Sequence, residues 1–173
     1  MNSGEIQVPA GSQTVGPYFH IGLEYLLERT PALTLDKPGT IEICGRILAR
    51  DGAPVPDAML EFWSAAEVAG QTPAFPSGFR RTVTDGDGRY SVVMERPTTP
   101  HMLVLVFARG LMRHLLSRIY FADEQANEND PVLVTITADR RRTLIAQPDE
   151  TRANVYGWNV ILQGAGETVF FAW

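Results

Sequence analysis

The sequence predicts an all-β protein, an antiparallel β-sandwich with short helices in the connections and near the N-terminus. Apolar and polar residues alternate with period two in several short segments, of which residues 41–47 are the clearest. Turn sequences such as Asp51-Gly52 separate these segments. Helical periodicity is scarce. Short strands with frequent turns are typical of a sandwich.

The first half of the chain supplies four of the expected strands. Residues 41–47 form the first strand, and residues 58–63 form the second after a turn rich in proline. Residues 79–84 and 89–94 flank the sequence Asp-Gly-Asp-Gly at 85–88, which predicts a hairpin.

The second half continues with strands and short helices. Residues 102–108 are all apolar and lie between Pro100 and Arg109-Gly110, as in a fully buried strand. Further strands are expected at 115–121, 132–137, 156–162 and 167–172. Short helices are expected at 23–29, 123–129 and 138–145, the last with Asp139 as its cap and with Leu144 and Ile145 facing the core.

Composition limits the protein class. A chain of 173 residues, 45% apolar, fits a single domain at 1–173 with an N-terminal arm at about 1–38. A net charge of −5 argues against a nucleic-acid partner, because phosphate binding needs a basic face. No signal peptide is evident, and the apolar run 102–108 is too short to span a bilayer. Cys44 is the only cysteine, so no internal disulfide forms; we expect a cytoplasmic protein without a membrane partner.

The histidines do not predict a metal site within the chain. The three are His20, His101 and His114, and no pair has the spacing of ligands on one strand or one helix. If the turn after residue 108 closes a hairpin, His101 lies near Tyr120 and His114 near Phe107. The two imidazoles are then on the order of 20 Å apart, too far to share an ion. We therefore expect no metal ligand in this chain.

Motifs of other enzyme classes are absent as well. The sequence contains no G-x-S-x-G elbow, phosphate-binding glycine loop or dinucleotide fingerprint. The acidic turn 85–88 does not continue as a calcium loop and is interpreted as a β-turn. The arginine run 140–142 is interpreted as a solvated helix face.

An unusual motif occupies residues 12–20, S-Q-T-V-G-P-Y-F-H. Gly16 allows backbone angles closed to other residues and Pro17 fixes φ, so the pair forms a stiff corner beside Thr14 and Tyr18. Two interpretations are open. The corner is either a simple turn with Tyr18 in the core, or a device that presents these side chains to a ligand.

Together with three later segments, this motif resembles the intradiol ring-cleavage dioxygenases. The matching segments are residues 12–20, residues 57–63 with 79–90, residues 100–110 with 116–121, and residues 163–171. They occur in the family's order and cover nearly the whole chain from residue 12. The resemblance implies a β-sandwich and the cleavage of catechols by dioxygen.

The resemblance also implies where the metal is held. Catalytic chains of the family bind Fe(III) through two tyrosines and an H-x-H pair, but the corresponding strand here reads Leu103-Val104-Leu105, with His101 displaced upstream. The loops at 64–78 and 96–100 contain no tyrosine. The chain thus resembles the family's iron-free alpha chains, whose partner is a homologous iron-bearing beta chain in an alpha-beta hetero-oligomer.

Such a chain would line its partner's substrate pocket and would contribute no catalytic residue alone. The resemblance assigns substrate binding to Thr14, Gly16, Pro17, Tyr18 and Arg109, the last as a contact for a ring carboxylate. The expected reaction is intradiol cleavage of protocatechuate to 3-carboxy-cis,cis-muconate. Two alternatives stay open, a self-sufficient intradiol catechol dioxygenase and a non-enzymatic transthyretin-like binding sandwich. For Arg109 the alternative is a structural ion pair, and for Thr14 a turn hydroxyl.

Overall fold

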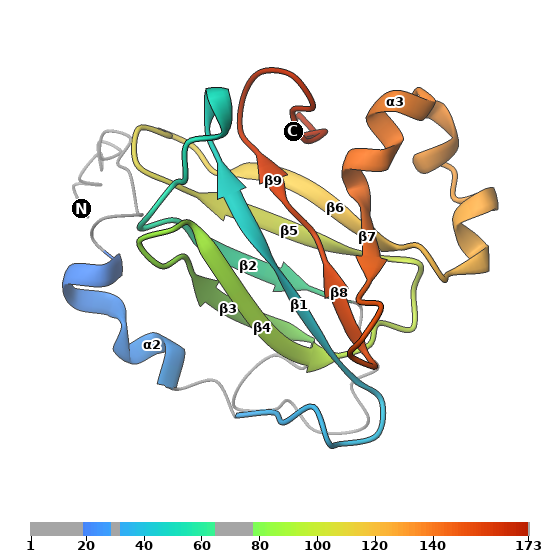
Figure 1. The fold of residues 1–173 in the computed structure, drawn as a ribbon, viewed down its shortest axis with the longest axis horizontal. Coiled ribbons are helices and arrows are strands. Elements are labelled where there is room, and N and C mark those ends of the chain that lie inside the picture. Colours follow the sequence, from blue (N-terminus) through green and yellow to red (C-terminus); the bar gives the residue numbers. More distant parts are fainter. Residues whose placement is uncertain (1–18, 29–31, 65–77, 173) are drawn as a thin grey trace, which may run out of the picture.

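The structure, a computed structural model, describes residues 19–28, 32–64 and 78–172, and strands dominate it (Figure 1). The strands are β1 (Thr40–Leu48), β2 (Met59–Trp63), β3 (Phe79–Val83), β4 (Arg89–Glu95), β5 (His101–Phe107), β6 (Leu115–Phe121), β7 (Ile145–Pro148), β8 (Val155–Gly157) and β9 (Val160–Ile161). The helical elements are the π-helical turn η1 (Phe19–Leu23), the α-helices α2 (Tyr25–Glu28) and α3 (Ala138–Arg141), and the 3₁₀ turns η2 (Arg50–Gly52), η3 (Gln125–Asn129), η4 (Leu133–Thr135) and η5 (Arg142–Leu144).

The strands form one curled sheet in the order β3-β2-β5-β6-β7-β8-β1-β4, with β9 also beside β1. The Thr82 hydroxyl on β3 donates to the Ser91 carbonyl on β4 at 2.8 Å, so the two ends of the sheet approach each other. The all-β prediction is confirmed. A purely antiparallel sheet is not, because β7 runs parallel to β6 and both β8 and β9 run parallel to β1. After the connection through residues 122–144, β7 begins beside the last residues of β6, with Ile145 opposite Tyr120, and runs in the same direction.

The predicted hairpin at 79–94 is correct in its turn and wrong in its pairing. The Asp85 carboxylate accepts the backbone N–H groups of Asp87 at 2.9 Å and Arg89 at 2.8 Å, which closes the acidic turn. Beyond the turn the strands diverge. β3 pairs with β2 and β4 pairs with β1, at opposite ends of the sheet order.

The C-terminal third departs most from the predicted elements. Residues 132–137 contain the 3₁₀ turn η4 instead of a strand, because the Asp130 carboxylate accepts the N–H groups of Val132 and Leu133 and starts a turn. The predicted strand at 156–162 is divided into β8 and β9. Residues 167–172 contribute only an isolated bridge between Phe171 and Leu116.

The predicted helices are shorter than expected. α2 ends the first described segment at residue 28. The helix expected at 138–145 is α3 followed by η5, and its last residue already begins strand β7. Thr137, rather than Asp139, is the N-cap residue of α3, and its side chain makes no capping hydrogen bond. Leu144 is fully buried, as predicted. No helix within the described ranges is long and apolar enough to cross a membrane.

The main core lies inside the curl of the sheet. It contains the inward side chains of β1, β2, β5, β6 and β8, among them Ile43, Phe62 and Val104, which are completely buried. One close backbone approach helps to shape it. Gly45 on β1 faces the carbonyl of Trp158, and a Cβ atom at Gly45 would lie 1.8 Å from that oxygen. The Trp158 backbone N–H donates to the Cys44 carbonyl at 2.8 Å, which fixes the approach.

Candidate functional site

The side of β5 that faces away from the core is the candidate functional surface, and we call it the outer face. Strand alternation sends Met102, Val104 and Val106 inward, where they are buried. His101, Leu103, Leu105 and Phe107 point to the outer face and stay half-buried. The neighbouring strands extend this face with Trp63 and Glu61 opposite Leu103 and Leu105 on β2, and with Tyr120, Arg118 and Leu116 opposite His101, Leu103 and Leu105 on β6.

A pocket of about 250 Å³ opens at one end of the outer face. Its lining residues are Trp63, Ser64, Thr99, His101 and Leu103. Trp63 packs against Phe79 with ring centroids 4.3 Å apart and keeps 38% of its surface exposed. The pocket is thus largely apolar, with an imidazole at its edge.

His101 lies beside a polar network formed by Tyr120 and Asp130. The Tyr120 hydroxyl donates to the Asp130 carboxylate at 2.9 Å, and Asp130 Oδ2 lies 3.6 Å from His101 Nδ1. Burial lowers the pKa of His101, as does the Arg118 guanidinium, against an opposing effect of Asp130. Burial also raises the pKa of Tyr120 to about 12, so its phenol stays protonated and serves as a donor. At neutral pH the site therefore presents a neutral imidazole.

The ordinary donors for a metal centre among the described residues are their His, Cys, Asp and Glu side chains. Within those ranges, no group of three or more His, Cys, Asp or Glu side chains is arranged to hold an ion. His101 is the only ordinary metal ligand in the lining of the outer-face pocket, and the next residue on the same side of β5 is Leu103. His114 lies toward the other end of the hairpin, where its ring stands 5.5 Å from that of Phe107. The predicted positions of His101 opposite Tyr120 and His114 near Phe107 are confirmed.

Arg109, the one predicted site residue among those described, follows the opposite end of β5. Its guanidinium donates to the Asp57 carboxylate at 2.9 Å, and its side chain is 68% exposed. Asp57 was not among the predicted site residues. The antiparallel register of β2 and β5 would have identified Asp57. Met59 lies opposite Phe107, so position 57, two residues earlier, lies opposite position 109.

Thr14, Gly16, Pro17 and Tyr18 lie outside the described residues. The next residue, Phe19, is described and is 1% exposed. The Arg81 guanidinium stands 5.6 Å from the centre of its ring, and Arg81 pairs with Glu61, on the β2–β3 part of the outer face. The chain therefore enters the described structure at the outer face.

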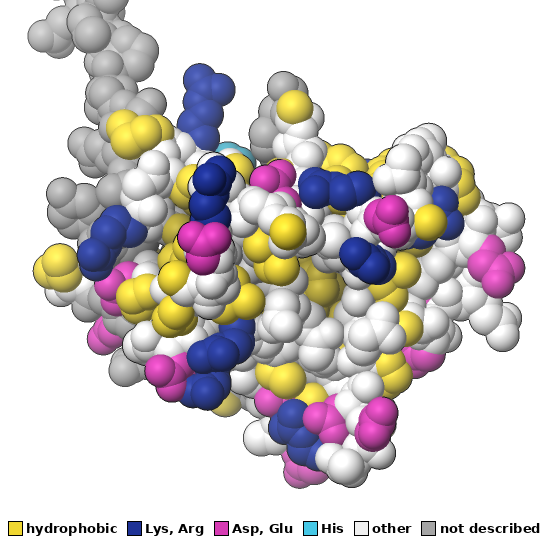
Figure 2. All heavy atoms as spheres, turned by 45° about the horizontal axis from the view of Figure 1, so that its top comes forward, with side chains coloured by type: hydrophobic (Ala, Val, Ile, Leu, Met, Phe, Trp, Pro, Cys, Tyr) yellow, Lys and Arg dark blue, Asp and Glu magenta, His cyan; other side chains and the backbone are white. Residues whose placement is uncertain are grey.

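The charged surface has no single sign. Figure 2 shows basic and acidic side chains interspersed over one face of the molecule, with apolar side chains between them. This pattern is consistent with the acidic net charge and gives no basic stripe on that face for a nucleic-acid backbone.

Comparisons with known proteins agree in sequence and in fold. The chain is 38% identical over 188 aligned positions to the protocatechuate 3,4-dioxygenase alpha chain of Burkholderia cepacia, covering 92% of this chain and 95% of the relative. It is 35% identical over 189 positions to the protocatechuate 3,4-dioxygenase alpha chain of Pseudomonas putida, covering 92% and 94%. No family model matches the chain.

Solved structures support the fold. The dioxygenase domain of a dioxygenase–carbohydrate-binding protein fusion from Streptomyces sp. SirexAA-E superposes with a TM-score of 0.60 at 19% identity, covering 95% of this chain and 97% of that one. The 3-chlorocatechol 1,2-dioxygenase of Rhodococcus opacus 1CP gives a TM-score of 0.56 at 18% identity, covering 92% and 69%.

Proposed function

The chain belongs to the intradiol dioxygenases, with the protocatechuate 3,4-dioxygenase alpha chains, and on this premise we propose that it is the alpha subunit of such an enzyme. The proposed enzyme is an alpha-beta hetero-oligomer in which a homologous beta chain holds Fe(III). It would cleave protocatechuate with dioxygen to 3-carboxy-cis,cis-muconate. This chain would bind and orient the substrate and exclude water from the pocket.

The observation that carries the proposal is the composition of the outer face. It combines half-buried apolar side chains on β5 and β6 with the exposed indole of Trp63. Aromatic residues are enriched in protein interfaces, and such a face is suited to a partner whose surface completes the pocket. The described residues offer iron only one histidine there, so the proposal assigns the metal to the partner.

Arg109 is the proposed contact for the substrate carboxylate. Its guanidinium has one described ion-pair partner, Asp57, and most of its surface is accessible. A guanidinium offers five N–H donors in a fixed fork, so it is able to keep one bond to Asp57 and bind a carboxylate with another edge. The Asp57 contact thus orients Arg109 for substrate.

The motif at Thr14, Gly16, Pro17 and Tyr18 is proposed to line the same pocket. Phe19 is buried beside Arg81 on the outer face, and the motif directly precedes it in the sequence.

Co-expression with a homologous chain that carries an H-x-H sequence tests the proposal. We expect the two chains to purify together, the complex to cleave protocatechuate, and the iron to remain with the partner when the subunits are separated. Each chain alone is the control. Stoichiometric iron bound to the isolated chain would favour a self-sufficient dioxygenase. Failure of the two chains to associate would favour an independent binding protein.

The Arg109→Ala substitution tests the carboxylate contact. Losing a charge-assisted hydrogen bond in a partly exposed site should raise the KM for protocatechuate about tenfold, with a smaller change for catechol, which lacks the carboxylate. Arg113→Ala is the matched control, because Arg113 is an exposed arginine in the same β5–β6 connection. Equal effects on the two substrates would contradict the proposed role.

A further inference from the structure

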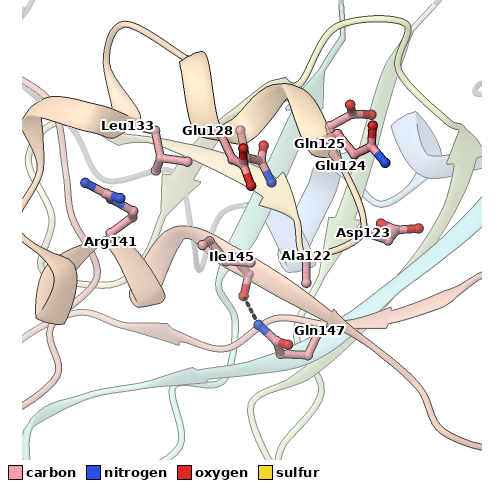
Figure 3. A pocket seen from close by; sticks show the side chains of 10 residues that line it. Ala122, Asp123, Glu124, Gln125, Glu128, Leu133, Arg141, Ile145 and Gln147 are labelled. Atoms are coloured by element: carbon pink, nitrogen blue, oxygen red, sulfur yellow. Dashed lines mark hydrogen bonds between the residues drawn. The ribbon is translucent and has the colours of Figure 1, made fainter.

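A second pocket, of about 460 Å³, lies between the end of β6, the turn η3, the helix α3 and strand β7. This volume is in the range of small-molecule sites. Figure 3 shows Arg141 and Leu133 at one end and Asp123, Glu124 and Gln125 at the other. The pocket shares no lining residue with the outer-face pocket and does not depend on the proposed function.

The positive end of the pocket is built on Arg141. Its Nη2 donates to the carbonyls of Ile136 at 3.1 Å and Val134 at 3.4 Å, which fixes the guanidinium. Its Nε is buried without a hydrogen-bond partner, and no carboxylate of the described residues forms an ion pair with it. A buried guanidinium donor without an acceptor is costly, so the arginine retains unused capacity for an anionic group.

Asn127 and Glu128 supply the hydrogen-bond acceptors of the pocket. The Asn127 Nδ2 donates to the Phe121 carbonyl at 2.6 Å, which fixes the orientation of the amide and leaves Oδ1 as an acceptor. That Oδ1 is buried without a partner. Glu128 is exposed at the pocket wall and makes no hydrogen bond or ion pair with another described residue. These two groups suit a donor that carries positive charge.

Apolar side chains also line the pocket. They are Ala122, Leu133 and Ile145, and Figure 3 shows Leu133 near Arg141. The other charged groups of the wall are already engaged. Asp123 accepts from Arg96 at 2.9 Å and from Tyr156 at 2.8 Å, and Glu124 accepts the Ala126 N–H at 3.1 Å.

We propose that this pocket binds a small zwitterion with an apolar body, the chemistry of an aliphatic α-amino acid. The ligand's carboxylate would contact Arg141, its ammonium group would contact Asn127 and Glu128, and its side chain would pack on Leu133 and Ile145. Arg141, Asn127 and Glu128 all line the pocket, which places the three side chains beside such a ligand.

Calorimetric titration of the full chain, as purified, with three matched compounds tests the site. The probes are L-leucine, 3-methylbutylamine, which lacks the carboxylate, and 4-methylpentanoate, which lacks the ammonium group. We expect L-leucine to bind and each truncated compound to bind at least about tenfold more weakly, since a charged hydrogen bond is lost in each case. No binding of L-leucine, or equal binding of all three, overturns the proposal.

The Glu128→Gln substitution then identifies the pocket. It removes a charge from an exposed side chain without a described partner, and it should weaken L-leucine binding several-fold while leaving 4-methylpentanoate unchanged. Glu150→Gln is the control, since Glu150 is an exposed glutamate away from the pocket. Equal L-leucine affinity in the Glu128→Gln and control proteins refutes the site. Because ring cleavage is not the readout, failure here leaves the proposed function untouched.

Discussion

Replacing Gly45 by alanine should be among the most damaging single changes to the described fold. The added Cβ would lie 1.8 Å from the Trp158 carbonyl oxygen and 2.7 Å from its carbon. Carbon–oxygen contacts normally begin at about 3.3 Å, so the two backbones must separate by about 1.5 Å. The Trp158 carbonyl also accepts the Tyr90 hydroxyl at 2.6 Å, inside the core.

The cost follows from the bonds that this separation breaks. It removes the Tyr90–Trp158 bond and the Trp158 N–H bond to Cys44, at about 1–3 kcal/mol for each buried group left without a partner. We expect Gly45→Ala to lower the free energy of unfolding by about 3–5 kcal/mol. With a urea m-value of about 2 kcal/mol/M, the midpoint falls by roughly 1.5–2.5 M.

Urea unfolding followed by tryptophan fluorescence measures the effect, because Trp158 is buried. Gly157→Ala is the matched control. Gly157 is also a strand glycine without a positive φ, and its nearest non-neighbour atom would be 3.9 Å from the new Cβ. That substitution should change stability by less than about 1 kcal/mol. Midpoints of the two variants that agree within error would refute the steric argument.

Two further predictions concern the network below the outer face. Tyr120→Phe should lower the free energy of unfolding by about 1.5–3 kcal/mol in the same urea assay, because it deletes a hydrogen bond to the buried Asp130 carboxylate; an unchanged midpoint would contradict this. The pKa of His101 is lower in the folded protein than its ordinary value near 6.5, so the unfolded chain binds the proton more readily as the pH falls. His101 thus reduces stability below about pH 6.5, and His101→Gln should make the fall between pH 7 and pH 5 shallower; an unchanged slope would contradict this assignment.

Local patterns in the sequence predict the centre of the sheet well. The apolar run before Arg109 predicts β5, and the turn at Arg109-Gly110 predicts that β6 follows as its hairpin partner. Together they predict the register in which His101 lies opposite Tyr120. The same reasoning placed Asp85 in a turn, and the structure confirms it. These features depend on residues close together in the chain, where periodicity and turn chemistry are decisive.

Pairings between distant segments are where sequence reasoning failed. Nothing local to the acidic turn reveals that its two flanking strands pair with different partners, β2 and β1. The sequence of the short β7, which ends at Pro148, is indistinguishable from the end of the predicted helix at 138–145. Only its pairing with β6 and β8 identifies it as a strand. The division between β8 and β9 arises at Asn159, whose side chain accepts the Arg46 N–H at 2.9 Å.

In the candidate site, too, local sequence features are predictable and contacts between distant segments are not. The family resemblance points to Arg109, whereas the contact between Arg109 and Asp57 follows only from the register between β2 and β5. The pocket beside Trp63 likewise combines residues from β2, β5 and the loop before β5. The amphipathic pattern of one strand cannot indicate which side chains a neighbouring strand places beside it.

The parallel pairing of β1 with β8 has a consequence for synthesis in the cell. Residues 42–44 hydrogen-bond with residues 155–157, so one flank of β1 lacks its neighbour until more than 100 further residues have been synthesised. During that interval the nascent chain exposes an unpaired strand edge, which other nascent chains are able to pair with. The emergence of residues 155–161, rather than that of the early strands, therefore sets the moment at which β1 gains its second neighbour.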